Sequence, residues 1–150
     1  MAMYKLGGNN NEQIKVYFYR KAQWLALELY KNMRTKEPLF NFKDIDEMTV
    51  QVDHVLPTIL TEAKVLQITD EKFASEIKTG KIFASNCSEE VELRAATITA
   101  CDTLAKELRE KHGKQNLSAI ELEWILRKVT AKQESLKMAP KFKCKDTLFY

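Results

Sequence analysis

Helical spacing of apolar residues dominates this 150-residue chain. After a polar stretch over residues 1–13, apolar side chains recur three and four positions apart, which is the period of an amphipathic helix. Only four glycines and three prolines occur, and this scarcity favours long helices over many-stranded sheets. The pattern therefore predicts a flexible leader over residues 1–13 and a single all-α domain over residues 14–150.

The first predicted helix starts near Val16 and ends before Pro38, because the residue before a proline disfavours helical geometry. Its apolar positions lie at steps of three and four, so one face is expected to pack inward. That face carries Ala22, Leu25, Leu29 and Met33.

The second predicted helix begins at Asp44, which forms a capping-box pattern with Glu47 three positions later. An apolar stripe with alternating steps of three and four follows it. The stripe consists of Ile45, Met48, Val52, Val55 and Ile59. Pro57 lies inside this stripe, so it either kinks the helix or ends one helix and opens another at Thr58.

Each of the next three helices starts at a capping residue, and the first two end at a glycine. They are predicted from Asp70 to Gly80, from Asn86 or Ser88 to Gly113, and from Ser118 to Val129. The middle one is the longest, and small residues on its buried face would let another helix approach closely. That face comprises Val91, Ala95, Ile98, Cys101, Ala105 and Leu108.

Composition excludes several classes of protein. A formal net charge of +3 is too small to indicate a nucleic-acid backbone as partner. No window approaches the roughly 20 apolar residues that a membrane helix needs. The three cysteines are scattered without metal-ligand spacing, which favours reduced thiols in a cytosolic protein.

A carboxylate and an imidazole, Asp53 and His54, stand side by side just before Pro57. On a helix, Asp46, Thr49 and Asp53 share one flank away from the apolar stripe. Asp53 then either belongs to a solvated polar face or projects into a cavity where helices diverge. A helix C-terminus is unfavourable for a carboxylate, so that position implies a task or a basic partner. His54 could carry protons or be an ordinary polar residue at a helix end.

Two further clusters of residues each allow a purely structural and a functional interpretation. The aromatic and cationic run over residues 17–23 is either a half-buried helix start or a base-stacking surface beside an anion-binding group. Glu90, Glu92 and Arg94 form either an exposed first-turn salt bridge of little energetic value or a buried group that orients a site. No Ser–His–Asp set, zinc-protease motif or Cys/His cluster accompanies them.

Several stretches together resemble, in order and roughly in spacing, the C-terminal half of the queuosine salvage protein family. They are VYFYRKAQWLALELY, FKDIDEMTVQVDHVLP, EEVELRAATI, LSAIELEWIL and the terminal LFY. The resemblance covers about Val16 to Tyr150. It implies a fold similar to helix-hairpin-helix DNA glycosylases and the activity of a queuosine 5′-phosphate N-glycosylase, which releases queuine for reuse in transfer RNA. It implies no metal or organic cofactor and no direct nucleic-acid binding.

By the same resemblance, the family's catalytic aspartate falls on Asp53 and its proline on Pro57. A carboxylate suits this chemistry, because cleavage of an N-glycosidic bond develops oxocarbenium character that an anion stabilises. Whether Asp53 acts as nucleophile or general base stays open. An aromatic side chain would stack on the base, and a cation would hold the 5′-phosphate. The candidate substrate-binding residues are Phe18, Arg20, Lys21, Asp46, His54, Glu92 and Arg94.

The chain departs from the family pattern at several positions. His54 and Val55 replace a tyrosine and an arginine, Glu123-Trp124 replaces an aspartate–tryptophan pair, and Arg127 stands where a second tryptophan is usual.

Family members also have an N-terminal half that contributes to the pocket. We therefore expect a second chain or a homo-oligomer to cover the face of that absent half. The alternative function is a non-catalytic or partner-dependent helical module that retains the fold. Action on DNA bases is disfavoured by the modest charge.

Overall fold

The computed structural model describes residues 2–5, 13–113 and 117–145, and helices dominate it. The helices are α1 (Arg20–Met33), α2 (Val55–Glu62), α3 (Glu71–Lys78), α4 (Ser88–His112), α5 (Ala119–Thr130) and α6 (Glu134–Met138), with 3-10 turns η1 (Pro38–Phe40) and η2 (Ile45–Glu47). The strands are β1 (Ala2–Lys5), β2 (Gln13–Val16), β3 (Ile82–Phe83) and β4 (Lys143–Cys144). β1 and β2 pair antiparallel, and β3 and β4 pair parallel. The predicted helical class is confirmed.

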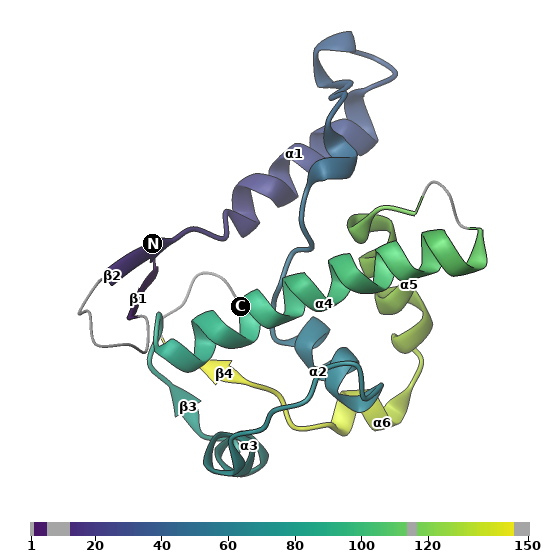
Figure 1. Cartoon of the computed structure of the whole chain (residues 1–150). Helices are drawn as coiled ribbons and strands as arrows, with labels where there is room; N and C mark the ends of the chain where they lie inside the picture. The colour runs from purple at the N-terminus through teal and green to yellow at the C-terminus, as the bar shows by residue number, and fades with distance from the viewer. Residues whose placement is uncertain (1, 6–12, 114–116, 146–150) are drawn as a thin grey trace.

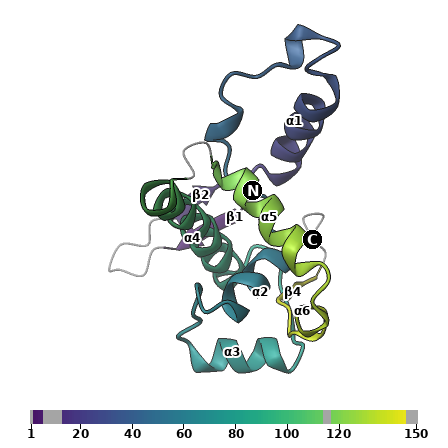
Figure 2. The same cartoon turned by 90° about the vertical axis from the view of Figure 1, so that its right-hand side faces the viewer.

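Helix α4 runs along the length of the body, with α2 and α5 packed against it, and α1 projects away from this body (Figures 1 and 2). The main core cluster joins these three packed helices to the segment before α2. It contains Val50, Val52, Leu56, Leu60, Cys101 and Ala119. A second cluster lies around α3 and the β3–β4 pair, where Phe83 and Phe142 stack. The Asp53 region therefore lies where the 50–54 segment meets α5.

Most of the predicted end signals of the later helices are confirmed, but the N-cap of α4 is Cys87, without a side-chain capping hydrogen bond, and not the predicted Asn86 or Ser88. The Asp70 carboxylate accepts a hydrogen bond from the backbone N–H of Phe73 at 3.0 Å and caps α3. Ser118 and Glu121 form the expected reciprocal capping box at the start of α5. Helix α4 ends at Gly113, whose φ of 65° lies in the left-handed region that glycine adopts without strain. Local sequence chemistry was sufficient at these positions.

The predicted inward face of α1 is confirmed only in part, since Leu29 and Met33 are half-buried. Ala22 and Leu25 are exposed, whereas Leu27 is buried in a small cluster with Ile45 and Ile120. The buried edge of the helix thus carries Leu27, and the part of the predicted stripe at Ala22 and Leu25 faces outward. The helix also begins at Arg20 and not at Val16, because Val16 lies in β2 opposite Ala2.

The buried face of α4 is confirmed only in part. Val91, Cys101 and Ala105 are buried as predicted, but Ala95 is exposed, and Ile98 and Leu108 are half-buried. Polar residues occupy much of the buried surface instead. They are Glu90, Arg94 and Thr97.

The predicted helix from Asp44 to Pro57 is also wrong. The Asp44 side chain makes no capping hydrogen bond, and only the three residues of η2 are helical. Residues 48–53 carry no helical turn, and α2 opens at Val55. Pro57 lies in the first turn of α2, where a helix needs no N–H from it. The proline therefore belongs to a helix start.

Two other expectations concern the chain as a whole. No helix among the described residues is long and apolar enough to cross a membrane. Strand β1 and the first residue of β2 fall within the predicted leader, and residues 1 and 6–12 of that leader lie outside the described residues. The boundary at residue 13 stays a prediction.

Candidate functional site

Asp53 lies immediately before α2 with its carboxylate turned onto the first turn of that helix. Its Oδ1 atom accepts hydrogen bonds from the backbone N–H groups of Val55 at 2.8 Å and Leu56 at 3.1 Å. The residue is 8% exposed. A helix N-terminus carries partial positive charge and unpaired N–H groups, so it stabilises an anion. The prediction that Asp53 lies at an unfavourable helix C-terminus, on one helical flank with Asp46 and Thr49, is therefore wrong.

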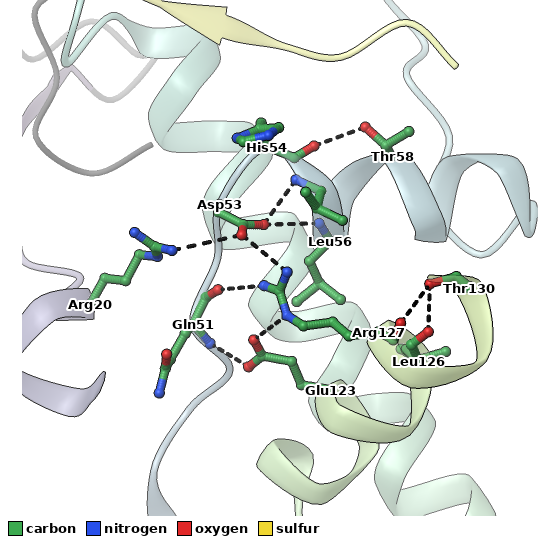
Figure 3. A network of polar contacts seen from close by, with 11 residues as sticks. Arg20, Gln51, Asp53, His54, Leu56, Thr58, Glu123, Leu126, Arg127 and Thr130 are labelled. Carbon is green, nitrogen blue, oxygen red and sulfur yellow. Dashed lines mark hydrogen bonds and ion pairs between the residues drawn. The ribbon is translucent and has the colours of Figure 1, made fainter. Parts of the chain in front are cut away.

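Arg127 of α5 binds the other carboxylate oxygen and links α5 to the segment before α2 (Figure 3). Its Nη1 donates to Asp53 Oδ2 at 3.0 Å, its Nη2 to the carbonyl of Gln51 at 3.1 Å, and its Nε to Glu123 Oε1 at 2.8 Å. Glu123 Oε2 in turn accepts from the Gln51 backbone N–H at 2.7 Å. The four residues therefore form a closed polar network that fixes the extended segment onto α5.

Arg20, the first residue of α1, approaches the same carboxylate from the opposite side (Figure 3). Its Nη2 atom lies 3.7 Å from Asp53 Oδ2. That separation is an ion pair and exceeds the length of a good hydrogen bond. Two guanidinium groups thus flank one carboxylate oxygen, and the contact from α1 is the longer of the two.

The surroundings of Asp53 favour its ionised form. Burial by itself raises the pKa of the carboxyl, but the hydrogen bond and charge of Arg127 and the N–H groups of Leu56 and Val55 bring it below its ordinary value. Burial by itself lowers the pKa of Arg127, but the carboxylates of Asp53 and Glu123 raise it above its ordinary value. Asp53 and Arg127 are therefore both charged at neutral pH.

His54 is half-buried beside this network. Burial lowers its pKa, the charge of Asp53 opposes that effect, and the cations Lys141, Arg127 and Arg20 add to it. The imidazole is therefore neutral at pH 7. Its backbone carbonyl accepts the Thr58 hydroxyl at 2.8 Å within α2 (Figure 3).

A second polar cluster joins the start of α4 to Phe18. Arg94 Nη1 lies 3.3 Å from Glu90 Oε1, and Glu90 Oε2 accepts the backbone N–H of Asn86 at 2.6 Å. The Arg94 guanidinium carbon lies 4.2 Å from the centre of the Phe18 ring. Glu90 and Arg94 are 3% and 4% exposed, so this ion pair is buried. Its part in a site stays a prediction.

The structure brings some of the predicted site residues together. Asp53, His54 and Arg20 are neighbours, and Phe18 and Arg94 form a separate contact. Lys21, Asp46 and Glu92 have exposed side chains on α1, η2 and α4. Asp46 lines another hollow of about 240 Å³, together with Lys31 and Trp124.

Comparison with known proteins places these residues in a family. The family model described as queuosine salvage protein matches residues 8–150. The chain belongs to the queuosine salvage protein family. The family predicted from the sequence motifs is thus confirmed.

Several relatives of this queuosine salvage chain bear the name queuosine 5′-phosphate N-glycosylase/hydrolase. One from Dictyostelium discoideum is 30% identical over 113 residues, which are 75% of this chain and 34% of the relative. One from Sphaerobacter thermophilus is 31% identical over 113 residues, or 75% and 33%. One from Mus musculus is 28% identical over 112 residues, or 75% and 32%. The chain spans about a third of the length of these relatives.

Sequence reasoning noted Glu123 and Arg127 only as departures from the queuosine salvage pattern and passed over Gln51. Their spacing of four on a helix does signal a pair, since such residues are neighbours on one face. Nothing local signals the contacts of Arg127 with Asp53 and Gln51, 74 and 76 residues away. Among the described residues, no group of three or more histidine, cysteine or acidic side chains could hold a metal ion.

Proposed function

We propose that this chain carries the catalytic carboxylate of an N-glycosyl hydrolase that cleaves queuosine 5′-monophosphate and releases queuine for transfer-RNA queuosine salvage. The observation that supports this most directly is Asp53, a buried, ionised carboxylate held at a helix N-terminus between two guanidinium groups. The names of the relatives support the same substrate. A helix-hairpin-helix glycosylase fold for the whole enzyme belongs to this proposal.

The proposed chemistry uses the negative charge of Asp53. Loss of the base leaves positive charge on the ribose, which a nearby anion stabilises either directly or by activating water. Both oxygens of Asp53 already have two partners each, namely two N–H groups and two guanidinium groups. One guanidinium must therefore move before Oδ2 can face the sugar.

Arg20 is the group that we expect to move. Its distance of 3.7 Å to Asp53 exceeds the 3.0 Å of Arg127, so its ion pair with this carboxylate is the weaker of the two. A dianionic 5′-phosphate is a stronger partner for a guanidinium than a shared carboxylate. Substrate binding would thus transfer Arg20 to the phosphate and expose the anion at the ribose in one step.

The remaining candidates take supporting roles in this proposal. Phe18, with Arg94 packed on its ring, is the aromatic residue that we assign to the base. Neutral His54 is assigned to hydrogen bonding with the substrate. The other proposed substrate contacts are Lys21, Asp46 and Glu92.

A second candidate function is that of a partner-dependent module, and the outward face of α1 favours it. Trp24 and Leu25 on this helix are each 54% exposed, and Tyr19 just before it is 63% exposed. Exposed apolar side chains in such proximity are typical of interaction surfaces. We propose that a second chain, or a second copy of this one, covers α1 and completes the pocket.

The test is incubation of the purified chain with queuosine 5′-monophosphate, with free queuine followed by chromatography. Asp53→Asn is the key variant, because its amide oxygen can still cap α2 while the charge is lost. We expect it to reduce release by roughly a hundredfold or more. Asp44→Asn is the matched control, since Asp44 is exposed and makes no capping bond.

The same assay separates the two candidates. If the chain alone is inactive, we would add the remaining portion of a full-length relative as a separate chain. Release that then appears, and depends on Asp53, supports the partner-dependent module. An inactive mixture that contains correctly folded components would refute the catalytic proposal.

A further inference from the structure

A hollow of about 250 Å³ lies between α2, α5 and α6, next to the network around Asp53. Its lining combines apolar side chains with cations. Val55 and Ile59 of α2 and Leu136 of α6 provide apolar surface, and Arg127, Lys137 and Lys141 provide the cations. Among the residues that the structure describes, none of those lining the hollow is acidic. A ligand matched to these walls has an apolar body and a negatively charged end.

Lys141 and Arg127 are the cations that suit such a charge. The Lys137 ammonium is already 2.5 Å from the carboxylate of Glu134 on the same helix. Lys141 Nζ donates one hydrogen bond to the carbonyl of Lys137 at 3.1 Å, and an ammonium has three N–H groups. The charges of Lys141 and Arg127 both lower the pKa of the nearby His54, so their fields overlap in this region.

Arg127 belongs both to this hollow and to the Asp53 network. A guanidinium has five N–H groups, and three of them bind Glu123, Asp53 and the Gln51 carbonyl. The other two are the donors that an anion in the hollow would use. A second anion on the same guanidinium competes with Asp53 for its charge, so binding in the hollow and the state of Asp53 are coupled.

We propose that this hollow binds a phosphate-class oxyanion carried on a small apolar body, through Lys141 and Arg127. Binding there weakens the hold of Arg127 on Asp53. Conversely, removal of the Asp53 charge strengthens the anion site, because coupling between two sites is reciprocal. The site is distinct from the proposed role of Arg20 and does not depend on glycosylase activity.

The experiment is isothermal titration of the full chain with phenyl phosphate, with inorganic phosphate and phenol as comparators. We expect saturable binding of phenyl phosphate to one site, weaker binding of inorganic phosphate, and none of phenol. Lys141→Gln should weaken binding about tenfold, the value of one lost charge-assisted hydrogen bond. Lys72→Gln on α3 is the matched control, since this exposed lysine is far from the hollow in sequence and does not line it.

The coupling has its own test. Asp53→Asn should tighten phenyl phosphate binding severalfold. Glu123→Gln should also tighten it, because this change removes the negative charge that Arg127 Nε binds. Circular dichroism confirms that each variant is folded, and either variant suffices. Unchanged affinity in folded variants would overturn the coupling. Equal binding of phenol and phenyl phosphate, or an unaffected Lys141→Gln chain, would overturn the anion site.

A last arm identifies the source of the anion. Queuosine 5′-monophosphate is titrated into the Asp53→Asn chain with and without saturating phenyl phosphate. Competition means that the 5′-phosphate of the nucleotide binds in this hollow and not at Arg20, whereas simultaneous binding leaves the 5′-phosphate with Arg20 and means that a separate small molecule is the anion. Both results support the site. Failure of the glycosylase proposal would leave the phenyl phosphate titration intact, so the two ideas fail separately.

Discussion

Replacement of Arg127 by methionine tests the central network most directly. The change keeps an unbranched apolar stem and removes the guanidinium that lies between Asp53 and Glu123. These two residues are 8% and 4% exposed, so water cannot fully replace the lost partner. Both carboxylates would then lie buried with one cation fewer, which is the costly way to break a buried ion pair.

The magnitude follows from these contacts. Loss of one partner from a buried charged pair costs about 3–5 kcal/mol. The Arg127 side chain is 28% exposed, and Asp53 keeps Arg20 and its two backbone N–H groups, which reduces the cost. We therefore expect a loss of about 3 kcal/mol in the free energy of unfolding. With a urea m-value of about 1–3 kcal/mol/M, the midpoint should fall by roughly 1–3 M.

Urea unfolding followed by circular dichroism measures this change. Lys128→Met is the matched control, because Lys128 is the exposed neighbour on the same helix and should change stability by no more than about 0.5 kcal/mol. An Arg127→Met midpoint equal to that of the control, with an unchanged m-value, would show that the network contributes nothing to stability.

The pH dependence of the free energy of unfolding tests the same ion pair. The folded chain lowers the pKa of Asp53 from its ordinary 3.8, so the unfolded chain binds this proton more readily. The stabilisation that ionised Asp53 gives to the folded state is thus fully present above pH 3.8 and is lost as the pH falls below 3.8. The stability gap between wild type and Arg127→Met should narrow in that range. A gap that widens there contradicts the assigned ion pair.

Two further substitutions test other parts of the fold. Glu90→Gln leaves the buried Arg94 charge without its carboxylate, so we expect a loss of about 3–5 kcal/mol in urea unfolding, and a loss below 1 kcal/mol would contradict a tight buried pair. Ser118→Ala removes one half of the capping box of α5 and should cost about 1 kcal/mol, seen as a small fall in the melting temperature, whereas an unchanged melting temperature would show that this cap does not hold the helix.

Helix ends were predictable from sequence where local chemistry decides them. The Asp70 cap, the Ser118–Glu121 capping box and Gly113 each involve residues within four positions of one another. A short-range hydrogen bond or a left-handed glycine needs no information from elsewhere in the chain. Those predictions therefore agree with the structure.

The segment before α2 could not be predicted in the same way. Its spacing of apolar residues and its Asp44–Glu47 pattern both favour a helix, yet residues 48–53 are not helical. The side chains of Glu123 and Arg127 bind the backbone N–H and carbonyl of Gln51, which a helix would use internally. Partners more than 70 positions away thus override the local preference. The α1 face was predicted only in part for a related reason, since periodicity shows that a helix has an apolar face but not what covers it.

The position of Asp53 shows what motif order can and cannot establish. Order along the chain selected Asp53 as a candidate, and its role stays a prediction. Its predicted environment was wrong, since Asp53 lies at the start of a helix and not at the end of one. Arg127, which the sequence comparison marked as a departure, is the closest charged partner of Asp53. The effect of a residue that departs from the family pattern can be judged only once the residues that it contacts are known. The Arg127 guanidinium both stabilises the Asp53 carboxylate and holds it in place. In the proposed function, the reactivity of Asp53 therefore depends on which anion competes for Arg20 and Arg127.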